Sequence, residues 1–427
     1  MKKVKILFII TNIDGFYEDA YSFGLGQLMS CVKENGHEFD LRVINHIEEE
    51  SKCIEHIHDW KPEIIGYTSV SSQFNHVKNL AKKVKKSGYK GFQVCGGSHP
   101  TIHPESIMES DDLACVFSGE AEEAFNDFVE AVANGKPWHH IKNISYNKNG
   151  KHIKNEKYAL VADLEKFPFP ERDIFFKHNT NTKFTGQNDG GFANFWFSRG
   201  CPYLCTYCQN QAIAMEYAGD KYGGLVFKAR YRSPQNCIDE ILWVKDNYNI
   251  KVVLIGDDTF GIDRKWAEEW SKLYKEQVKL PFRMKIRLHL VNHSRMDMLL
   301  EAGLQECYTS VEHGNEYIRN TLFKRNMKRE TIVNAFKFFH DNKIPANTNY
   351  IIGSPAETES TLEDCLDLNR EIQPKNCRAN IFYPYTGTTL GDYCFQNDLV
   401  DMNKYGNFSE ERKGSVMKWE DPDFSDK

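Results

Sequence analysis

Three cysteines set close together are the residues of this sequence whose types and spacing most clearly indicate chemistry. Cys201, Cys205 and Cys208 lie within eight residues, in the stretch SRGCPYLCTYCQN. Thiolates are the ligands of [4Fe-4S] clusters, and a tight loop with three of them can bind three irons of a cubane and leave the fourth free of protein ligands. An iron with an open coordination position can bind a substrate or cofactor, just as catalytic zinc sites keep a position open and structural zinc sites do not.

Zinc is the main alternative for such a group of thiolates. A structural zinc site needs a fourth cysteine or histidine at short spacing, and none follows Cys208 before Cys237. The spacing therefore favours an iron-sulfur cluster. The chain has twelve cysteines, and the other nine mostly lie in apolar segments, where we expect them to be small buried hydrophobes.

Length and composition narrow the class of protein. At 427 residues the chain exceeds what one hydrophobic core usually organises, so we expect two domains and a tail. The net charge of -6 provides no global field for a polyanion, so we expect no nucleic-acid partner. The N-terminal apolar run ends at Ile10 and predicts a buried strand, and no run approaches the roughly 18 apolar residues of a membrane span. We therefore expect a cytoplasmic protein with no membrane partner.

In the first third of the chain, short β-rich runs alternate with helical patterns. This alternation predicts an α/β domain over residues 1–142, doubly wound and Rossmann-like, with five parallel strands and helices on both faces. A hairpin is expected to turn at Asn149-Gly150. Pro168 and Pro170 disfavour helix, so residues 143–190 are expected to form a hairpin and an interdomain linker.

A second alternating series covers residues 191–385. Its six strand-helix units predict an open, partial (β/α)6 barrel of the TIM type rather than a closed eight-stranded one. The cysteine loop directly follows the first strand of this series, at the carboxyl end where barrel active sites lie. Residues 386–427 are polar and rich in Gly, Asp and Lys, and they are expected to form a short C-terminal tail.

The CxxxCxxC pattern, with Tyr207 before its last cysteine, resembles the signature loop of radical S-adenosylmethionine (SAM) enzymes. In that family the open iron binds the amino and carboxylate groups of SAM. One electron from the cluster then cleaves SAM to methionine and a 5'-deoxyadenosyl radical, which abstracts an unactivated hydrogen. The cofactor carries the difficult chemistry and the protein orients it. The resemblance also implies an electron donor such as flavodoxin or ferredoxin.

Further motifs at strand ends resemble the SAM-binding elements of that family. LIGDDTF places Asp257 and Asp258 where family members bind the methionyl amino group, and a carboxylate suits an ammonium group. SVEHGN places Glu312 near the ribose or amino end of SAM, although such a carboxylate can instead cap the next helix. YIIGSPAET places Gly353 where the backbone approaches the adenine, and Tyr207 is expected to pack near that ring.

The loops after the strands of the first domain are rich in Gly, Ser and Thr, which suits an extended polar cofactor. They contain no GxGxxG after the first strand, so a dinucleotide is not expected. They resemble the cobalamin-binding domain of B12-dependent (class B) radical SAM enzymes, in which GGxHPT is a recurring fourth-strand loop. With the barrel, the resemblance covers roughly residues 1–385. The cobalamin-binding residues that it implies are Thr68, Ser69, Ser71, Gly96, Gly97, His99, Gly119 and Glu120.

The DxHxxG motif that supplies an axial histidine in other B12 proteins is absent from the sequence. The resemblance therefore implies that cobalamin binds with no protein histidine on cobalt. His99 is the nearest candidate ligand, but a loop histidine before proline is more often structural or a hydrogen-bond donor.

The resemblance implies a radical SAM enzyme that uses a [4Fe-4S] cluster, SAM and cobalamin. Its commonest activity is methylation of an unactivated carbon, with methylcobalamin delivering the methyl group to a radical on the substrate. Cyclisation or rearrangement without methyl transfer is an alternative, and a non-enzymatic B12 or redox sensor is another. The strand-end carboxylates argue against the sensor, because a sensor needs no SAM site.

Two features bear on the substrate. Methylthiotransferases that modify tRNA share the barrel but hold a second cluster in the first domain, whereas Cys31 falls in a predicted helix and Cys95 and Cys115 in predicted strands. The C-terminal segment is shorter than in many class B members. The expected substrate is a small-molecule natural product, a peptide or a saccharide. The short C-terminal segment favours a large substrate, such as a peptide or saccharide, or a second chain that completes the site. The catalytic acid or base, and the roles of Arg287 and His289, stay open.

Overall fold

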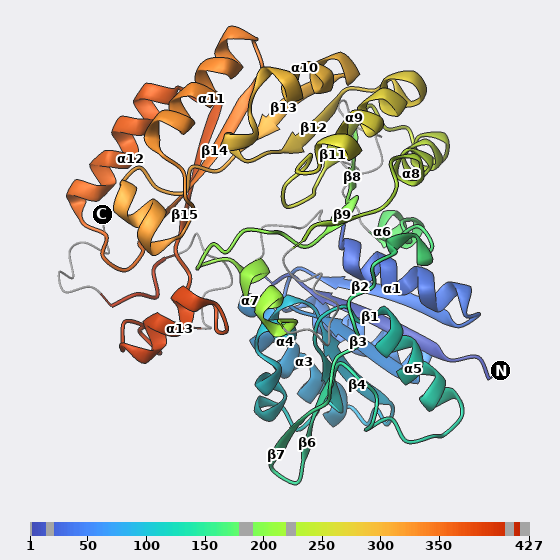
Figure 1. Cartoon of the computed structure of the whole chain (residues 1–427). Helices are drawn as coiled ribbons and strands as arrows, with labels where there is room; N and C mark the ends of the chain where they lie inside the picture. The colour runs from blue at the N-terminus through green and yellow to red at the C-terminus, as the bar shows by residue number, and fades with distance from the viewer. Residues whose placement is uncertain (1, 14–20, 179–190, 219–227, 406–413, 419–427) are drawn as a thin grey trace.

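The computed structural model describes residues 2–13, 21–178, 191–218, 228–405 and 414–418. Each half of the chain contributes one large sheet, and a long connection joins the two (Figure 1). No helix in these ranges is both long and apolar enough to cross a bilayer.

The first sheet confirms the doubly wound prediction. Its parallel strands follow the order β2-β1-β3-β4-β5. The direction in which successive strands are added to the sheet reverses between β1 and β3, which is the topological switch point. Alternate residues of β1 face opposite cores: Ile6 and Phe8 pack under α1 and α5, and Leu7 and Ile9 pack over α2 and α3. The elements are β1 (Lys5–Thr11), α1 (Phe23–Glu34), β2 (Glu38–Ile44), α2 (Glu49–Trp60), β3 (Ile64–Thr68), α3 (Phe74–Lys86), β4 (Phe92–Gly96), α4 (Ser98–Ile102), β5 (Cys115–Phe117) and α5 (Glu122–Ala133).

The hairpin turns at Asn149-Gly150 as predicted, but it belongs to the first sheet rather than to a separate connection. Its strands are β6 (Ile144–Lys148) and β7 (Lys151–Lys154), and β6 pairs antiparallel with β5. Asn143 fixes the junction, because its Nδ2 donates to the carbonyl of Ser118 at 2.9 Å. The hairpin covers the edge that the short strand β5 would otherwise expose.

The second sheet confirms six parallel strands, in the order β8-β11-β12-β13-β14-β15. The helices α8 to α12 follow the outer side of this curved sheet (Figure 1). Local sequence starts these helices: Ser233 caps α8 with Pro234 at its first position, and Thr358 and Thr361 form a capping box on α12. The elements are β8 (Phe192–Phe195), α8 (Pro234–Asn247), β11 (Val252–Ile255), α9 (Arg264–Leu273), β12 (Phe282–Lys285), α10 (His293–Ala302), β13 (Leu304–Tyr308), α11 (Arg329–Asp341), β14 (Ala346–Ile352), α12 (Glu359–Ile372) and β15 (Asn376–Ile381).

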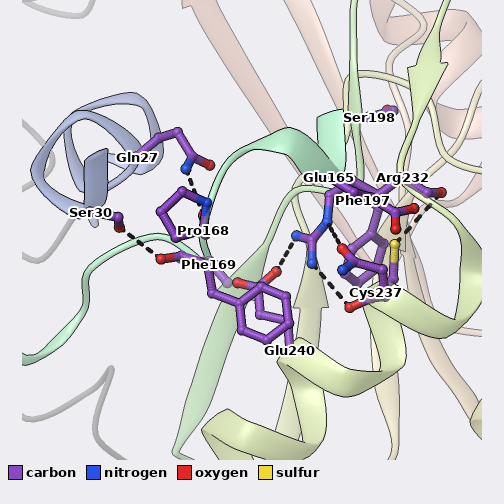
Figure 2. Close-up of polar contacts among 12 residues, drawn as sticks. Gln27, Ser30, Glu165, Pro168, Phe169, Phe197, Ser198, Arg232, Cys237 and Glu240 are labelled. Atoms are coloured by element: carbon purple, nitrogen blue, oxygen red, sulfur yellow. Dashed lines mark hydrogen bonds and ion pairs between the residues drawn. The ribbon is translucent and has the colours of Figure 1, made fainter. Parts of the chain in front are cut away.

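The proline-containing connection is held by both halves of the molecule. On the side of the first sheet, Gln27 Nε2 and Ser30 Oγ of α1 each donate at 2.7 Å, to the carbonyls of Pro168 and Phe169 (Figure 2). On the side of the barrel, the Ser233 amide donates to Glu165 Oε1 at 2.6 Å. Extended backbone leaves its carbonyls free for such bonds.

Arg172 continues this connection into the barrel. Its Nη2 donates to Glu240 Oε1 at 2.8 Å and to the carbonyl of Asn194 at 2.9 Å. Arg232 pairs with the other oxygen of Glu240 (Figure 2), and the Glu240 side chain is fully buried. The connection is therefore fastened to α1 at Pro168 and Phe169 and to the barrel on either side of them, at Glu165 and Arg172, which fixes how the two sheets face each other.

The C-terminal segment differs from the expectation of a plain tail. It contains α13 (Thr389–Gln396), whose Leu390 and Cys394 pack in a cluster with Phe382 and Phe323. The amide of Leu390 donates to the carbonyl of Thr206 in the cysteine loop at 2.9 Å. The helix therefore covers the cysteine loop, although the segment around it is polar in composition.

Candidate active site between the two sheets

The cysteine loop lies at the carboxyl end of the second sheet, as predicted. It follows β9 (Ser198–Arg199) and leads into α7 (Gln209–Glu216), for which Cys208 is the N-cap residue. Cys205 is buried, whereas Cys201 and Cys208 are partly exposed. Gly200 has φ +91°, and a Cβ there would lie 2.8 Å from the carbonyl of Lys228, so this turn requires glycine.

The three thiols fit the donor set of an iron-sulfur cluster. They share one loop, and Cys205 contributes to the electrostatic environment of both Cys201 and Cys208. Burial raises the pKa of Cys201, and that of Cys208 to about 12, so metal binding must displace protons. Within the described residues, no group of three His, Cys, Asp or Glu side chains is arranged to hold a single metal ion.

Two arginines that no motif indicated point at Cys205. Arg287 Nη1 lies 3.7 Å from its sulfur and Arg325 Nη1 lies 3.9 Å from it. The Arg287 guanidinium also stacks on the ring of Tyr203 at 3.7 Å, and Tyr203 Oη hydrogen-bonds His289 Nε2 at 2.8 Å. Arg287 comes two residues after β12. Its position at the end of a barrel strand was therefore the sequence signal that could have indicated a role in the site.

The two neighbouring carboxylates after β11 have different surroundings. Asp257 is fully buried, and its Oδ1 accepts from the amides of Phe197 at 2.7 Å and Ser198 at 3.3 Å. Burial raises its pKa to about 7. Asp258 is exposed, its side chain is hydrogen-bonded by Asn210, and it contributes to the electrostatic environment of the loop cysteines. Asp257 therefore holds the strand entering the cysteine loop, and Asp258 is the carboxylate open to a ligand.

Tyr207 of the cysteine loop contacts Glu312, which lies in the segment after β13. Tyr207 Oη donates to Glu312 Oε1 at 2.8 Å, and Arg325 Nη2 lies 3.6 Å from the same oxygen. Glu312 has φ +71° and pairs through its backbone with β14, where the amide of Ile351 donates to its carbonyl at 2.6 Å. The carboxylate is therefore held between a phenol and a guanidinium.

Gly353 is positioned by an acidic residue that the motif analysis missed. Its φ is +79°, and its amide donates to Glu357 Oε1 at 2.8 Å. Glu357 Oε2 also lies 3.1 Å from Nε2 of His313, and both side chains are buried. The GSPAE segment thus forms a rigid turn after β14, with Glu357 as its internal acceptor.

A cavity of about 640 Å³ lies between the two halves of the molecule. Its lining combines apolar residues of the first sheet, such as Phe8 and Val43, with a few polar groups, as is usual for cofactor sites. The cysteine loop contributes Cys201 to this lining. Six of the residues expected to bind cobalamin also line it: Thr68, Ser69, Gly96, Gly97, Gly119 and Glu120.

Two details of this lining fit a large bound cofactor. Gly97 has φ +102°, and a Cβ there would lie 2.6 Å from the carbonyl of Ser69, so the loop after β4 requires glycine. Thr11 Oγ1 is buried, lines the cavity and has no hydrogen-bond partner in the described part of the chain. Buried polar atoms are normally satisfied, so this hydroxyl suits a ligand.

The other two expected residues, Ser71 and His99, lie outside the lining. His99 Nδ1 and Ser71 Oγ are 3.1 Å apart, and the His99 ring packs on Phe74 with centroids 4.3 Å apart. Burial lowers the pKa of His99 to about 4, so this histidine is neutral at physiological pH. Its contacts suit a structural role for the loop after β4.

Glu120 lines the cavity but is also an interdomain residue. Its carboxylate pairs with Arg230 and lies 3.6 Å from Nη1 of Arg199. Its amide donates to Tyr217 Oη at 3.0 Å. Arg199 comes two residues before Cys201, so this ion-pair group joins the loop after β5 to the start of the cysteine loop. Arg230 and Tyr217 belong to no motif that the sequence displayed, and Arg199 lies in the cysteine stretch but was not singled out there.

Two family descriptions match the chain in the order of its sheets. The B12-binding domain matches residues 10–129, and the radical SAM superfamily matches residues 197–368. The first match runs from the end of β1 into α5 and includes the glycine-rich loops. The second begins just before the cysteine loop and runs into α12.

Among curated proteins, the chain is similar to the uncharacterized methyltransferase PH0819 of Pyrococcus horikoshii. The two are 27% identical over 94% of this chain and 85% of the relative. An anaerobic magnesium-protoporphyrin IX monomethyl ester cyclase of Rubrivivax gelatinosus is 21% identical, over 86% of this chain and 65% of that protein. The chain is therefore similar both to a protein named as a methyltransferase and to a protein named as a cyclase.

Among solved structures, the fold is similar to that of the radical SAM methyltransferase TsrM from Kitasatospora setae, solved with tryptophan and a SAM analogue. The TM-score is 0.72 at 13% identity, covering 92% of this chain and 76% of that one. The cobalamin-dependent radical enzyme OxsB, solved with aqua-cobalamin and SAM, has a TM-score of 0.69 at 19% identity, with 93% and 56% covered. With both domains matched in order, the chain belongs to the cobalamin-dependent radical SAM enzymes, whose cofactors are a [4Fe-4S] cluster, SAM and cobalamin.

Proposed function

We propose that this enzyme methylates an unactivated carbon of a natural-product, peptide or saccharide substrate. One observation carries the proposal: a single cavity is bordered by the loops after β3, β4 and β5 on one side and by Cys201 on the other. Two cofactor sites that open into one cavity can act on the same bound substrate. Such proximity replaces a second encounter with an intramolecular step.

In this proposal the residues of the barrel hold the radical-generating cofactors. Cys201, Cys205 and Cys208 ligate the cluster. Asp258 binds the ammonium group of SAM, because its carboxylate is the exposed one of the pair and Asn210 orients it. When bound, the cluster and SAM supply a 5'-deoxyadenosyl radical, and cobalamin supplies a transferable methyl group. An electron donor such as flavodoxin or ferredoxin delivers the electron.

The residues of the first sheet shape the cobalamin side of the cavity. Gly97 keeps the loop after β4 free of a side chain where the backbone turns. Thr68, Ser69 and Thr11 contribute hydroxyl-bearing side chains to the lining. The apolar lining around Phe8 and Val43 excludes water, which protects a reactive radical from quenching.

The test begins with anaerobic reconstitution of the full chain with iron, sulfide and hydroxocobalamin. Iron and cobalamin are counted after desalting, in wild type and in a variant with Cys201, Cys205 and Cys208 all changed to Ala. We expect about four irons and one cobalamin in wild type, and a variant that loses the iron but keeps the cobalamin. Wild type that binds iron without cobalamin would contradict methyl transfer and leave the radical SAM assignment standing.

Cyclisation or rearrangement without methyl transfer is the second candidate, because the chain is also similar to a cyclase. Candidate substrates are incubated with SAM that carries a deuterated methyl group. Methylation predicts a labelled product together with both S-adenosylhomocysteine and 5'-deoxyadenosine. Cyclisation predicts 5'-deoxyadenosine and an unlabelled product.

A further inference from the structure

The three loop cysteines have different electrostatic surroundings. Cys205 is buried and faces two guanidinium groups, with Arg287 Nη1 at 3.7 Å and Arg325 Nη1 at 3.9 Å from its sulfur. Cys201 and Cys208 instead accept from the backbone amides of Tyr203 and Asn210, and both experience the negative charge of Asp258. Cys205 is therefore the thiol that contacts both guanidinium groups, while Arg287 also contributes to the electrostatic environment of Cys201.

Both guanidinium groups are held in place. Arg287 Nη2 donates to the carbonyl of Arg325 at 2.7 Å, and its plane stacks on Tyr203. Arg325 Nη2 donates to the carbonyl of Ser310 at 2.9 Å. The two residues are only 6% and 9% exposed, so solvent screens their charge weakly.

The two charges are compensated differently. Arg325 lies near the carboxylate of Glu312, at 3.6 Å. Arg287 makes its polar contacts with a sulfur and a carbonyl, and its Nε has no partner in the described part of the chain. A buried cation beside a thiol suits a site where negative charge arrives.

We propose that Arg287, together with Arg325, is a positioning residue that sets the reduction potential of the cluster through Cys205. The inference rests on the proposed role of the three cysteines as cluster ligands. Reduction transfers one electron from the donor protein, which is oxidised by one electron, and adds one negative charge to the cluster. A fixed cation hydrogen-bonded to a ligand sulfur stabilises the reduced state more than the oxidised state, and so raises the potential.

The experiment measures the potential directly and needs no turnover. Full-length wild type, Arg287→Gln, Arg287→Lys and Arg325→Gln are reconstituted without oxygen, and iron is counted in each. The midpoint potential is then determined without SAM, by dithionite titration followed by electron paramagnetic resonance. Arg295→Gln is the matched control, because Arg295 is also buried near this end of the barrel but its Nη1 donates to the carbonyl of Leu290.

We expect Arg287→Gln to retain iron and to make reduction at least tenfold less favourable, a shift of about 59 mV to more negative potential for one electron. Arg287→Lys shifts less, because it keeps the charge and loses the planar fork. Equal potentials in Arg287→Gln and Arg295→Gln would overturn the proposal. If Arg287→Gln loses its iron, unchanged potentials in both Arg287→Lys and Arg325→Gln would overturn it. Absence of iron from wild type would instead overturn the cluster assignment itself.

Discussion

Tyr207 Oη donates a hydrogen bond of 2.8 Å to Glu312 Oε1, and so joins the end of the cysteine loop to the segment that follows β13. The Glu312 side chain is buried and has Arg325 as its second neighbour. This bond fixes the half of the loop that carries Cys208. It also orients the carboxylate that the sequence motif is expected to place near SAM.

Tyr207→Phe removes this bond without changing the shape of the ring. Because it leaves a buried carboxylate oxygen short of a donor, we expect the free energy of unfolding to fall by about 1 to 3 kcal/mol. SAM should also bind more weakly to the reconstituted protein. Urea unfolding and calorimetric SAM titration measure the two effects. Tyr393→Phe, at a tyrosine that is 48% exposed on α13, is the control and should change neither.

Glu240→Gln tests the connection between the two sheets. Glu240 is fully buried between Arg172 and Arg232, so the substitution leaves two buried cations without a counter-charge. We expect a loss of about 3 to 5 kcal/mol in urea unfolding, as for other broken buried ion pairs. Glu268→Gln breaks an exposed pair with Arg264 on α9 and should cost less than about 1 kcal/mol. Equal losses in the two variants would contradict a fastening role for the connection.

Asp257 makes stability depend on pH in a direction opposite to most carboxylates. Burial raises its pKa from 3.8 to about 7, so between these values the folded protein holds a proton that the unfolded chain releases. The contribution of this group therefore becomes less favourable as pH rises through that window. Asp257→Asn keeps an acceptor for the Phe197 amide and removes the charge.

We expect Asp257→Asn apoprotein to match wild type near pH 4 and to exceed it in stability by a few kcal/mol, at most about 4, above pH 7. Chemical unfolding at a series of pH values gives the difference curve. The stability of Asp341→Asn, on the surface of α11, should depend on pH in the same way as that of wild type. If the stability difference between Asp257→Asn and wild type does not change with pH, the buried carboxyl is not the source of the pH dependence.

The parts of the site that the sequence predicted are local in the chain. The cysteine spacing, the two aspartates after one strand and the glycines after β4 each lie within a few residues, so their patterns were visible without a fold. The contacts of Cys205 with Arg287 and Arg325 join residues 82 and 120 positions apart and form only when the strands assemble. Helix α13 was missed because its three buried positions, Leu390, Gly391 and Cys394, lie in a segment that is otherwise polar in composition.

Leu390→Ala tests whether α13 covers the cysteine loop. Leu390 is 3% exposed, so truncation of its side chain leaves a cavity. Its amide donates to the carbonyl of Thr206, so this cavity lies beside the cysteine loop. We expect a stability loss of about 2 to 5 kcal/mol, faster hydrogen exchange in residues 386–400 and faster loss of iron in air. Leu366→Ala removes the same atoms from a side chain that is 49% exposed on α12 and should change none of these. Unchanged iron loss in Leu390→Ala would contradict a protective role for α13.

Gly97→Ala and Gly36→Ala separate backbone strain from a blocked cofactor site. Both glycines have positive φ, of +102° and +78°, so both substitutions strain the backbone. Only Gly97 has no room for a Cβ, which would lie 2.6 Å from the carbonyl of Ser69, whereas the space around Gly36 is open. The added methyl group must therefore displace the loop after β4 in one variant and not in the other. We expect Gly97→Ala to retain iron and lose cobalamin after desalting, while Gly36→Ala retains both; equal cobalamin content would place the cofactor away from this loop.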